Sequence, residues 1–161
     1  MKPARILIGG IGNIFLGDDA FGCEVARQLA NHPLPDGVRV VDFGIRGLDL
    51  TYALLEDYQR VILVDAVARG GKPGTLYVIE PALPEAGALE MHEMAPAKVL
   101  AAARGMGARL AEVLIIGCEP ENLGAEEEPR MGLSPVVESA VEEAVGMIKV
   151  MVTKALETVH A

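Results

Sequence analysis

Three short, continuous apolar runs constrain the fold of this chain more than any other feature of its sequence. They occupy residues 5–10 (RILIGG), 60–67 (RVILVDAV) and 111–120 (AEVLIIGCEP). An unbroken apolar run of this length is typical of a β-strand buried on both faces, as strands are in parallel sheets. Such a sheet needs helices on both sides.

Segments of helical periodicity separate these runs. We predict helices from residue 18 to the NHPLP segment at 31–35, at 48–58, at 95–107 and from Ser134 onward, where Ser134 is a suitable N-cap and Pro135 suits the first helical position. Two further strands are predicted at 38–44 and around 76–80. The glycine-rich link before the latter is too short for a helical crossover, so this strand should run antiparallel to the strand at 60–67.

This order of elements predicts an α/β fold: a three-layer sandwich with a mostly parallel, five-stranded twisted sheet and helices on both faces. At 161 residues the chain should form one domain, 1–161.

Composition excludes some classes of function. The formal net charge is −9 and no cluster of Lys and Arg is present, which argues against a nucleic-acid binder. No apolar run approaches the ~20 residues of a membrane helix, and the N-terminus lacks a secretory signal, so we expect a cytoplasmic protein without a membrane partner. Cys23 and Cys118 lie in apolar segments and are expected to be buried, reduced thiols.

Acidic residues follow several of the predicted strands. Asp18 and Asp19 come after the first strand, Asp42 ends the second and Asp65 ends the third. Ligands of open α/β sheets bind beyond the carboxyl ends of the strands. These four acids should therefore lie along one edge of the sheet.

The glycine-rich stretch GGIGNIFLGDDAFG (9–22) admits several interpretations. A dinucleotide loop is disfavoured, because the third glycine of G-x-G-x-x-G is missing and two acids at a helix entrance would repel a pyrophosphate. The phosphate-loop pattern also fails, since no Gly-Lys-Ser/Thr follows. On this segment alone, helix capping is the favoured role of the two acids.

Asp65 and His92 add a second possibility. A carboxylate at the end of a buried strand is costly unless it is paired or bound to a ligand. His92 lies between the fourth strand and the next helix and could reach the same edge. Two carboxylates and an imidazole form a plausible three-ligand site for nickel, zinc, manganese or cadmium.

Five features resemble one family in their order and spacing. They are GIGNIFLGDDAFG, DFGIRGLDL, VILVDAV, the histidine at 92 and GLSPVVESAVEEAV. Together these motifs resemble those of the hydrogenase maturation endopeptidases, and the resemblance covers nearly the whole chain. The resemblance implies an endopeptidase that removes the C-terminal extension of the nickel–iron hydrogenase large-subunit precursor after nickel insertion.

The resemblance also implies a set of site residues. The family's metal ligands fall on Asp19, Asp65 and His92, with nickel as the metal, either resident or carried by the substrate. Asp42, Gly44 and Gly47 match a motif that we assign to substrate contact or loop shape. No further catalytic residue is identified, and neither cysteine is a convincing nucleophile.

Two mechanisms remain open from the sequence. The ligands could hold a metal that polarises the scissile carbonyl or activates water, or they could recognise the nickel of the precursor. A different class of protein, a non-catalytic nickel carrier or assembly chaperone, could use the same ligands, and a nucleotide-binding regulator is a weaker option. We expect a monomer that binds the large-subunit precursor transiently.

Overall fold

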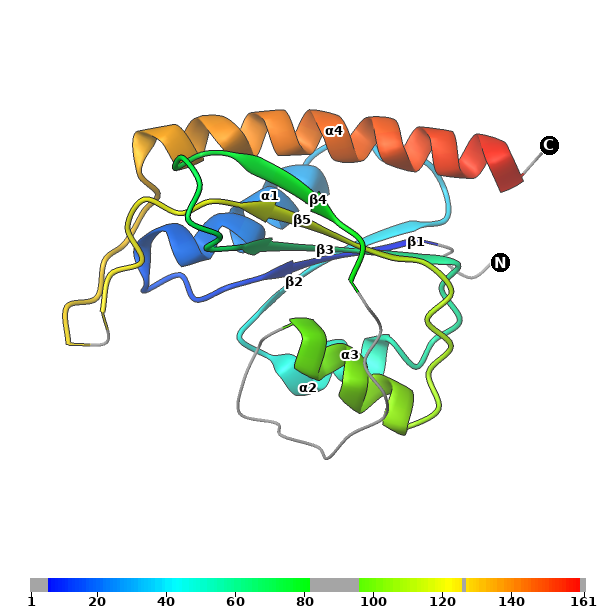
Figure 1. Cartoon of the computed structure of the whole chain (residues 1–161). Helices are drawn as coiled ribbons and strands as arrows, with labels where there is room; N and C mark the ends of the chain where they lie inside the picture. Colours follow the sequence, from blue (N-terminus) through cyan, green and yellow to red (C-terminus); the bar gives the residue numbers. More distant parts are fainter. Residues whose placement is uncertain (1–5, 82–95, 126, 160–161) are drawn as a thin grey trace.

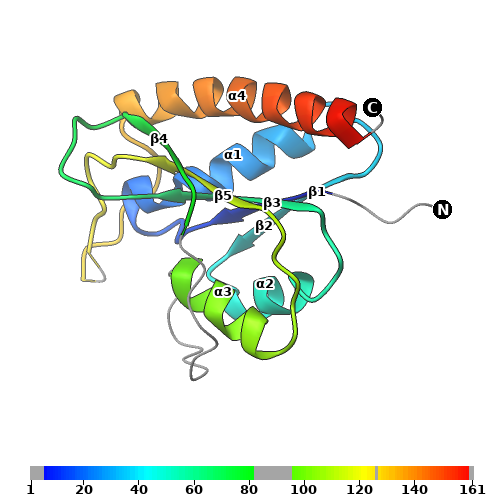
Figure 2. The same cartoon turned by 45° about the vertical axis from the view of Figure 1, so that its right-hand side comes forward.

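The computed structural model describes residues 6–81, 96–125 and 127–159 and shows three layers (Figure 1). The middle layer is a sheet of the strands β1 (Ile6–Ile11), β2 (Val38–Gly44), β3 (Arg60–Ala66), β4 (Leu76–Ile79) and β5 (Val113–Cys118). A 3-10 turn, η1 (Gly17–Ala20), precedes the helices α1 (Phe21–Ala30), α2 (Gly47–Ala53), α3 (Pro96–Gly105) and α4 (Pro135–Val159). Helices α1 and α4 cover one face, and α2 and α3 cover the other (Figure 2).

The sheet has the strand order β2-β1-β3-β5-β4 within the described residues. All neighbours are parallel except β4, which is antiparallel to β5. The predicted fold class is therefore confirmed, while the single domain over 1–161 stays a prediction.

The predicted direction of β4 is confirmed. It is antiparallel to β5, which is parallel to β3, so β4 runs antiparallel to β3 with β5 between the two. Both edges of β3 are already paired, with β1 through Arg60–Val64 and with β5 through Val61–Ala66. The short glycine-rich link reverses the chain but does not determine the neighbour.

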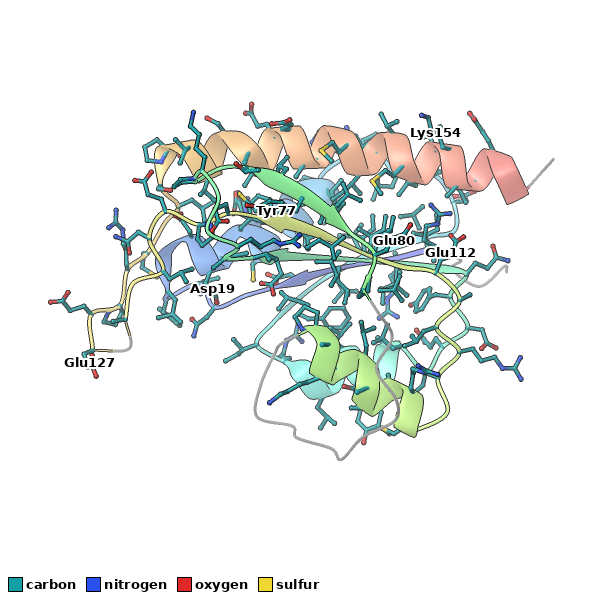
Figure 3. All side chains as sticks on the ribbon, in the orientation of Figure 1. Asp19, Tyr77, Glu80, Glu112, Glu127 and Lys154 are labelled. Atoms are coloured by element: carbon teal, nitrogen blue, oxygen red, sulfur yellow. The ribbon has the colours of Figure 1, made fainter. Side chains whose placement is uncertain are left out.

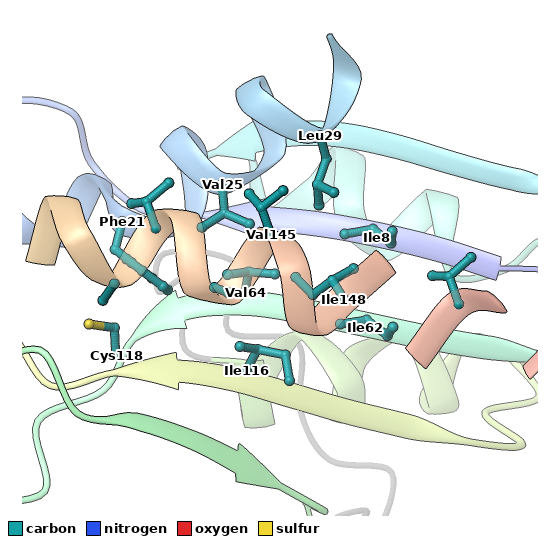
Figure 4. Close-up of a cluster of buried hydrophobic side chains, with 14 of the residues drawn as sticks. Ile8, Phe21, Val25, Leu29, Ile62, Val64, Ile116, Cys118, Val145 and Ile148 are labelled. Carbon is teal, nitrogen blue, oxygen red and sulfur yellow. The ribbon is translucent and has the colours of Figure 1, made fainter. Parts of the chain in front are cut away.

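The larger core lies between the sheet and the helices α1 and α4 (Figure 4). Side chains of β1, β3 and β5 meet helix residues there, among them Ile8, Val64, Ile116, Phe21 and Ile148, each fully buried. Burying one such side chain contributes about 1.5–3 kcal/mol. This core fixes the orientation of α1, and with it the turn η1 that precedes the helix.

The second core lies on the opposite face, under α2 and α3. It includes Leu7, Leu63, Leu50, Leu100 and Phe43. Since adjacent residues of β1 and β3 contribute to opposite cores, these strands need apolar residues at every position. This explains the continuous apolar runs in the sequence.

Two glycines allow α1 to pack directly on the sheet. A Cβ on Gly10 would lie 2.3 Å from the carbonyl oxygen of Gly22, and a Cβ on Gly22 would lie 2.0 Å from that of Val64. No other residue type fits at these positions unless the helix moves away. The glycines that sequence reasoning tested as a phosphate loop therefore serve, in part, close helix–sheet packing.

The helices of the described residues include none with both the length and the apolar character that a membrane crossing requires.

The glycine contact gives a paired prediction. Gly22→Ala should lower the free energy of unfolding by about 2–4 kcal/mol, because its methyl group overlaps the backbone of β3. Gly146→Ala, inside α4 with open space around its Cβ position, should instead raise it by about 0.5–1 kcal/mol. Urea denaturation followed by circular dichroism measures both. Equal effects of the two variants would contradict the packing argument.

Candidate active site at the carboxyl edge of the sheet

Asp19 and Asp65 lie together at the carboxyl ends of β1 and β3. Asp65 is the penultimate residue of β3. Asp19, which is labelled in Figure 3, belongs to η1. Burial raises the pKa of Asp65 to about 8, and the negative charge of Asp19 contributes to the increase. The backbone N–H of Ala66 donates to Asp65 Oδ1 over 2.9 Å. This hydrogen bond lowers the pKa of Asp65 and offsets only part of the increase. The charge of Asp19 thus disfavours ionisation of Asp65, and a bound cation would favour it.

The loop before η1 holds Asp19 in place. The backbone N–H of Asn13 donates to Asp19 Oδ2 over 2.8 Å. Burial nevertheless raises the pKa of Asp19 above its usual value, because this one hydrogen bond does not compensate for it. Gly12 has a φ of +148°, and a Cβ there would lie 1.9 Å from the carbonyl oxygen of Asp19. The glycine is required for the loop to pass this close to Asp19.

Asp18 has a different role from its neighbour. Its side chain is 1% exposed. The backbone N–H groups of Glu121, Asn122 and Ser134 donate to its carboxylate at 2.7–2.9 Å, and so does the hydroxyl of Ser134, at 2.8 Å. Asp18 therefore ties η1 to the β5–α4 connection and to the start of α4.

The hydrogen bonds keep Asp18 ionised. Burial by itself raises its pKa, but the bonds from Ser134, Asn122 and Glu121 outweigh that effect, so the pKa lies below its usual value. The expected helix-capping role of the two acids is wrong: neither η1 nor α1 has a side-chain cap in the described structure. The helix α4 does begin at Pro135 as predicted, although the hydroxyl of Ser134 is donated to Asp18. A contact between residues 116 positions apart carries no local signal in the sequence.

The structure brings together only part of the expected metal site. Asp19 and Asp65 interact, while His92 lies outside the described residues. Among the residues that are described, no group of three or more His, Cys, Asp or Glu side chains is arranged to hold a metal ion. The three-ligand site thus stays a prediction. Two of its three proposed ligands, Asp19 and Asp65, lie close to each other in the structure.

A groove opens beside these carboxylates. It has a volume of about 320 Å³, and its lining comes from the β1–η1 loop, from Cys23 and from the β2–α2 loop: Gly12, Asn13, Ile14, Phe15, Cys23, Asp42, Phe43, Gly44, Ile45 and Arg46. The two loops are joined where the N–H of Gly12 donates to the carbonyl oxygen of Gly44 over 3.1 Å. Sequence reasoning missed this groove, although apolar residues in both glycine-rich loops were a signal for it.

The three residues expected to contact substrate differ in position. Asp42 and Gly44 line the groove, and the N–H of Gly44 donates to Asp42 Oδ1 over 3.0 Å. Gly44 has a φ of +56°, so a loop-shaping role suits it. Gly47 is not among the lining residues and starts α2 without a positive φ.

Cys23 forms part of the groove floor but is not prepared for nucleophilic attack. Its thiol donates to the carbonyl oxygen of Gly12 over 3.4 Å. Burial raises the pKa of this thiol strongly, and the charges of Asp42, Asp19 and Asp65 raise it further. Burial also raises the pKa of Cys118 to about 12. Both cysteines are free and buried, as expected from the sequence.

Glu119, directly after β5, is an acid at the same edge that sequence reasoning did not single out. Its side chain accepts hydrogen bonds from the hydroxyl of Tyr77 and from the backbone N–H groups of Arg69 and Gly71. These bonds, with that of Tyr77 first, hold the pKa of Glu119 below its usual value. Because the carboxylate is satisfied by this loop, Glu119 has a structural role.

Comparison with known proteins gives one consistent result. A model of the hydrogenase maturation protease family matches residues 23–150. A putative hydrogenase maturation protease of Methanocaldococcus jannaschii is 36% identical over 152 residues, which cover 92% of this chain and 96% of that protein. The hydrogenase 2 maturation protease of Escherichia coli is 33% identical over 150 residues, covering 89% of this chain and 88% of that one.

Solved structures agree with these sequence matches. The hydrogenase maturating endopeptidase HybD from Escherichia coli superimposes with a TM-score of 0.76 at 31% identity, covering 94% of this chain and 93% of that one. The [NiFe] hydrogenase maturation protease HycI from Thermococcus kodakarensis has a TM-score of 0.69 at 27% identity, with 93% of each chain covered.

The role of Asp18 can be tested by Asp18→Asn. The amide cannot accept all of the bonds that the carboxylate accepts, so the free energy of unfolding should fall by about 2–4 kcal/mol at pH 7. Since the folded pKa lies below the unfolded value near 3.8, the carboxylate stabilises the protein above that pH and loses its effect as the pH falls through the folded pKa. The difference between wild type and variant should therefore shrink in acid. Asp36→Asn, at an exposed loop position, serves as the control and should change stability by less than about 0.5 kcal/mol.

The raised thiol pKa values predict low reactivity. Iodoacetamide at pH 7 should leave both cysteines of the folded protein unmodified over a period that suffices for both to react in denaturant. Intact mass spectrometry counts the added groups. Rapid modification of Cys23 in the folded state would show that the groove floor holds a reactive thiolate.

Proposed function

This chain belongs to the hydrogenase maturation protease family, and we propose that it removes the C-terminal extension from the large-subunit precursor of a nickel–iron hydrogenase after nickel has been inserted. The observation that carries the proposal is the placement of two partly buried acids, Asp19 and Asp65, at the same edge of the sheet, beside an open groove in a chain of this family.

Several features support a protease over a carrier. The Escherichia coli structure bears the name endopeptidase, and the Thermococcus kodakarensis structure is named as a [NiFe] hydrogenase protease. A groove next to the carboxylates suits a polypeptide substrate, whereas a carrier needs only the ligands. The nickel carrier or assembly chaperone is therefore not favoured.

The donor set fits a divalent cation in part. Asp19 and Asp65 are both partly buried and supply carboxylate oxygens, and among the described residues no cationic side chain contributes to the pKa of either. Oxygen ligands suit weak and exchangeable binding of nickel better than a permanent structural site. A bound divalent ion would polarise the scissile carbonyl or activate a water molecule.

We assign to Asp19 and Asp65 the recognition of the nickel that the precursor carries, with His92 as a third ligand. The N–H of Asn13 keeps one oxygen of Asp19 oriented, and the N–H of Ala66 does the same for Asp65. Asp42 and Gly44 are proposed to contact the substrate from the groove, while Gly47 shapes the start of α2. The cytoplasmic location and the monomeric state stay predictions.

The proposal is tested by incubating the purified protein with nickel-loaded and nickel-free forms of a large-subunit precursor from the same organism. Intact mass should show loss of a C-terminal peptide from the loaded form only. Metal analysis of the protein alone, before mixing, distinguishes a resident ion from nickel brought by the substrate. Stable binding without any loss of mass would favour the carrier instead.

Asp19→Asn and Asp65→Asn should each lower the cleavage rate by about 100-fold or more, because each removes a charged ligand from the site. Asp65→Asn should unfold at the same temperature as wild type or higher, since an amide avoids the cost of burying a charge. Asp36→Asn, exposed and remote from the groove, should cleave at the wild-type rate. Wild-type cleavage by both site variants would refute their assignment.

A further inference from the structure

We propose that the groove is a specificity subsite that receives one apolar side chain from an internal segment of the precursor, next to the bond that is cleaved. This inference rests on the proposed function and adds to it the chemistry of the segment that is recognised.

The first support is the exposure of apolar side chains around the groove. Ile14, Phe15 and Ile45 line it and are 46%, 55% and 65% exposed. They come from two different loops, joined at their base by the bond between Gly12 and Gly44. Neighbouring exposed apolar side chains on a folded protein mark a binding surface more often than chance.

The size of the groove restricts the occupant. Its volume of about 320 Å³ is at the lower end of the range for ligand pockets, ~300–1,000 Å³. This volume suits one large side chain with its backbone and excludes a folded element such as a helix. The occupant is therefore one side chain and the short piece of polypeptide that carries it.

The charges beside the groove restrict it further. Asp42 lines the groove, and Cys23 in its floor lies within the electrostatic influence of Asp42, Asp19 and Asp65. The guanidinium of Arg46, which also lines the groove, is already paired with Asp49 over 3.2 Å. A segment that complements this surface carries neutral or positive groups where it reaches the carboxylates. Asp42 disfavours a free C-terminal carboxylate in the groove, so we take the occupant to be an internal segment of the precursor.

The side chain of Arg46 already occupies two backbone acceptors near the end of β2. Arg46 donates from Nε to the carbonyl oxygen of Phe43 over 3.2 Å and from Nη2 to that of Asp42. These acceptors of the edge strand are thus already used. We therefore assign recognition in the groove to a side chain of the substrate rather than to strand addition at these two acceptors.

Phe15→Ser and Ile45→Ser test the subsite with the nickel-loaded precursor as the probe. Each should lower kcat/KM by about 10- to 100-fold, mainly through a higher KM, since removing apolar contact area weakens binding of the matching side chain. Both positions are exposed, so the melting temperature should stay close to that of wild type. Val150→Ser changes a comparably exposed residue (54%) on α4 and should cleave like wild type.

A matched change in the substrate completes the test. Once mass spectrometry has located the cleaved bond, the flanking apolar residues of the precursor are replaced one at a time by Ser and by Asp. At one position of the precursor, replacement by Ser should lower kcat/KM for the wild-type enzyme but not for the Phe15→Ser variant. The precursor with Asp at that position should have the lowest kcat/KM. Equal kcat/KM for all of these combinations would overturn the subsite.

A photo-crosslinking amino acid at position 15 provides a readout that does not depend on cleavage. Crosslinks to the precursor within a few residues of the cleaved bond support the subsite. Crosslinks to a distant part of the precursor, or between two copies of this chain, would overturn it in favour of a docking surface or a dimer interface. Failure of the wild-type enzyme to cleave any loaded precursor refutes the proposed function instead, so the two failures are distinguishable.

Discussion

The close backbone contact between α1 and the sheet determines the geometry of the whole carboxyl edge. Gly10 and Gly22 let the first turn of α1 rest against β1 and β3, and Gly12 lets the β1–η1 loop pass beside Asp19. Since β3 ends in Asp65, this contact brings an acid from η1 next to an acid from the sheet. A side chain at any of these glycines would move the acid of η1 away from the acid of β3. The glycine-rich loop therefore serves backbone proximity here.

Adjacent acids in one turn acquire opposite properties from their surroundings. Asp18 points into the protein, where backbone N–H groups of the β5–α4 connection satisfy its charge. Asp19 accepts one hydrogen bond, from the N–H of Asn13, and its negative charge disfavours ionisation of the nearby Asp65. The first arrangement stabilises the fold, and the second costs stability unless a cation binds. Such a cost at a site is commonly the sign of function, because the uncompensated charge is what the ligand satisfies.

Asp18 also helps to hold Asp19 in position. By joining η1 to the start of α4, Asp18 connects the segment that carries Asp19 to the longest helix of the described structure. The loop 13–17 is further paired with the β5–α4 connection, through the N–H of Gly17 to the carbonyl oxygen of Arg130 and the N–H of Arg130 to that of Phe15. The exposed side chain of Phe15 therefore projects from a backbone that is fixed on both sides. A rigid rim of this kind is what a subsite of defined specificity needs.

Local patterns in the amino-acid sequence are enough to predict the layers of the fold and the family of the chain. Continuous apolar runs predict strands buried on both faces, and this follows directly because β1 and β3 place alternate residues in opposite cores. The resemblance of the motifs led to the family, because glycines and acids in a fixed local order are visible without a structure. The carboxyl-end rule placed Asp19 and Asp65 at one edge, which the structure confirms.

Features that depend on contacts between distant segments emerge only in the folded chain. The position of β4 beside β5 follows from competition for the edges of β3, which no local pattern records. The role of Asp18 depends on Ser134, 116 positions away. The groove exists because two loops from neighbouring strands are joined at Gly12 and Gly44. Local patterns specify which residues are apolar, flexible or charged, whereas the partner of each is set by packing that involves the whole chain.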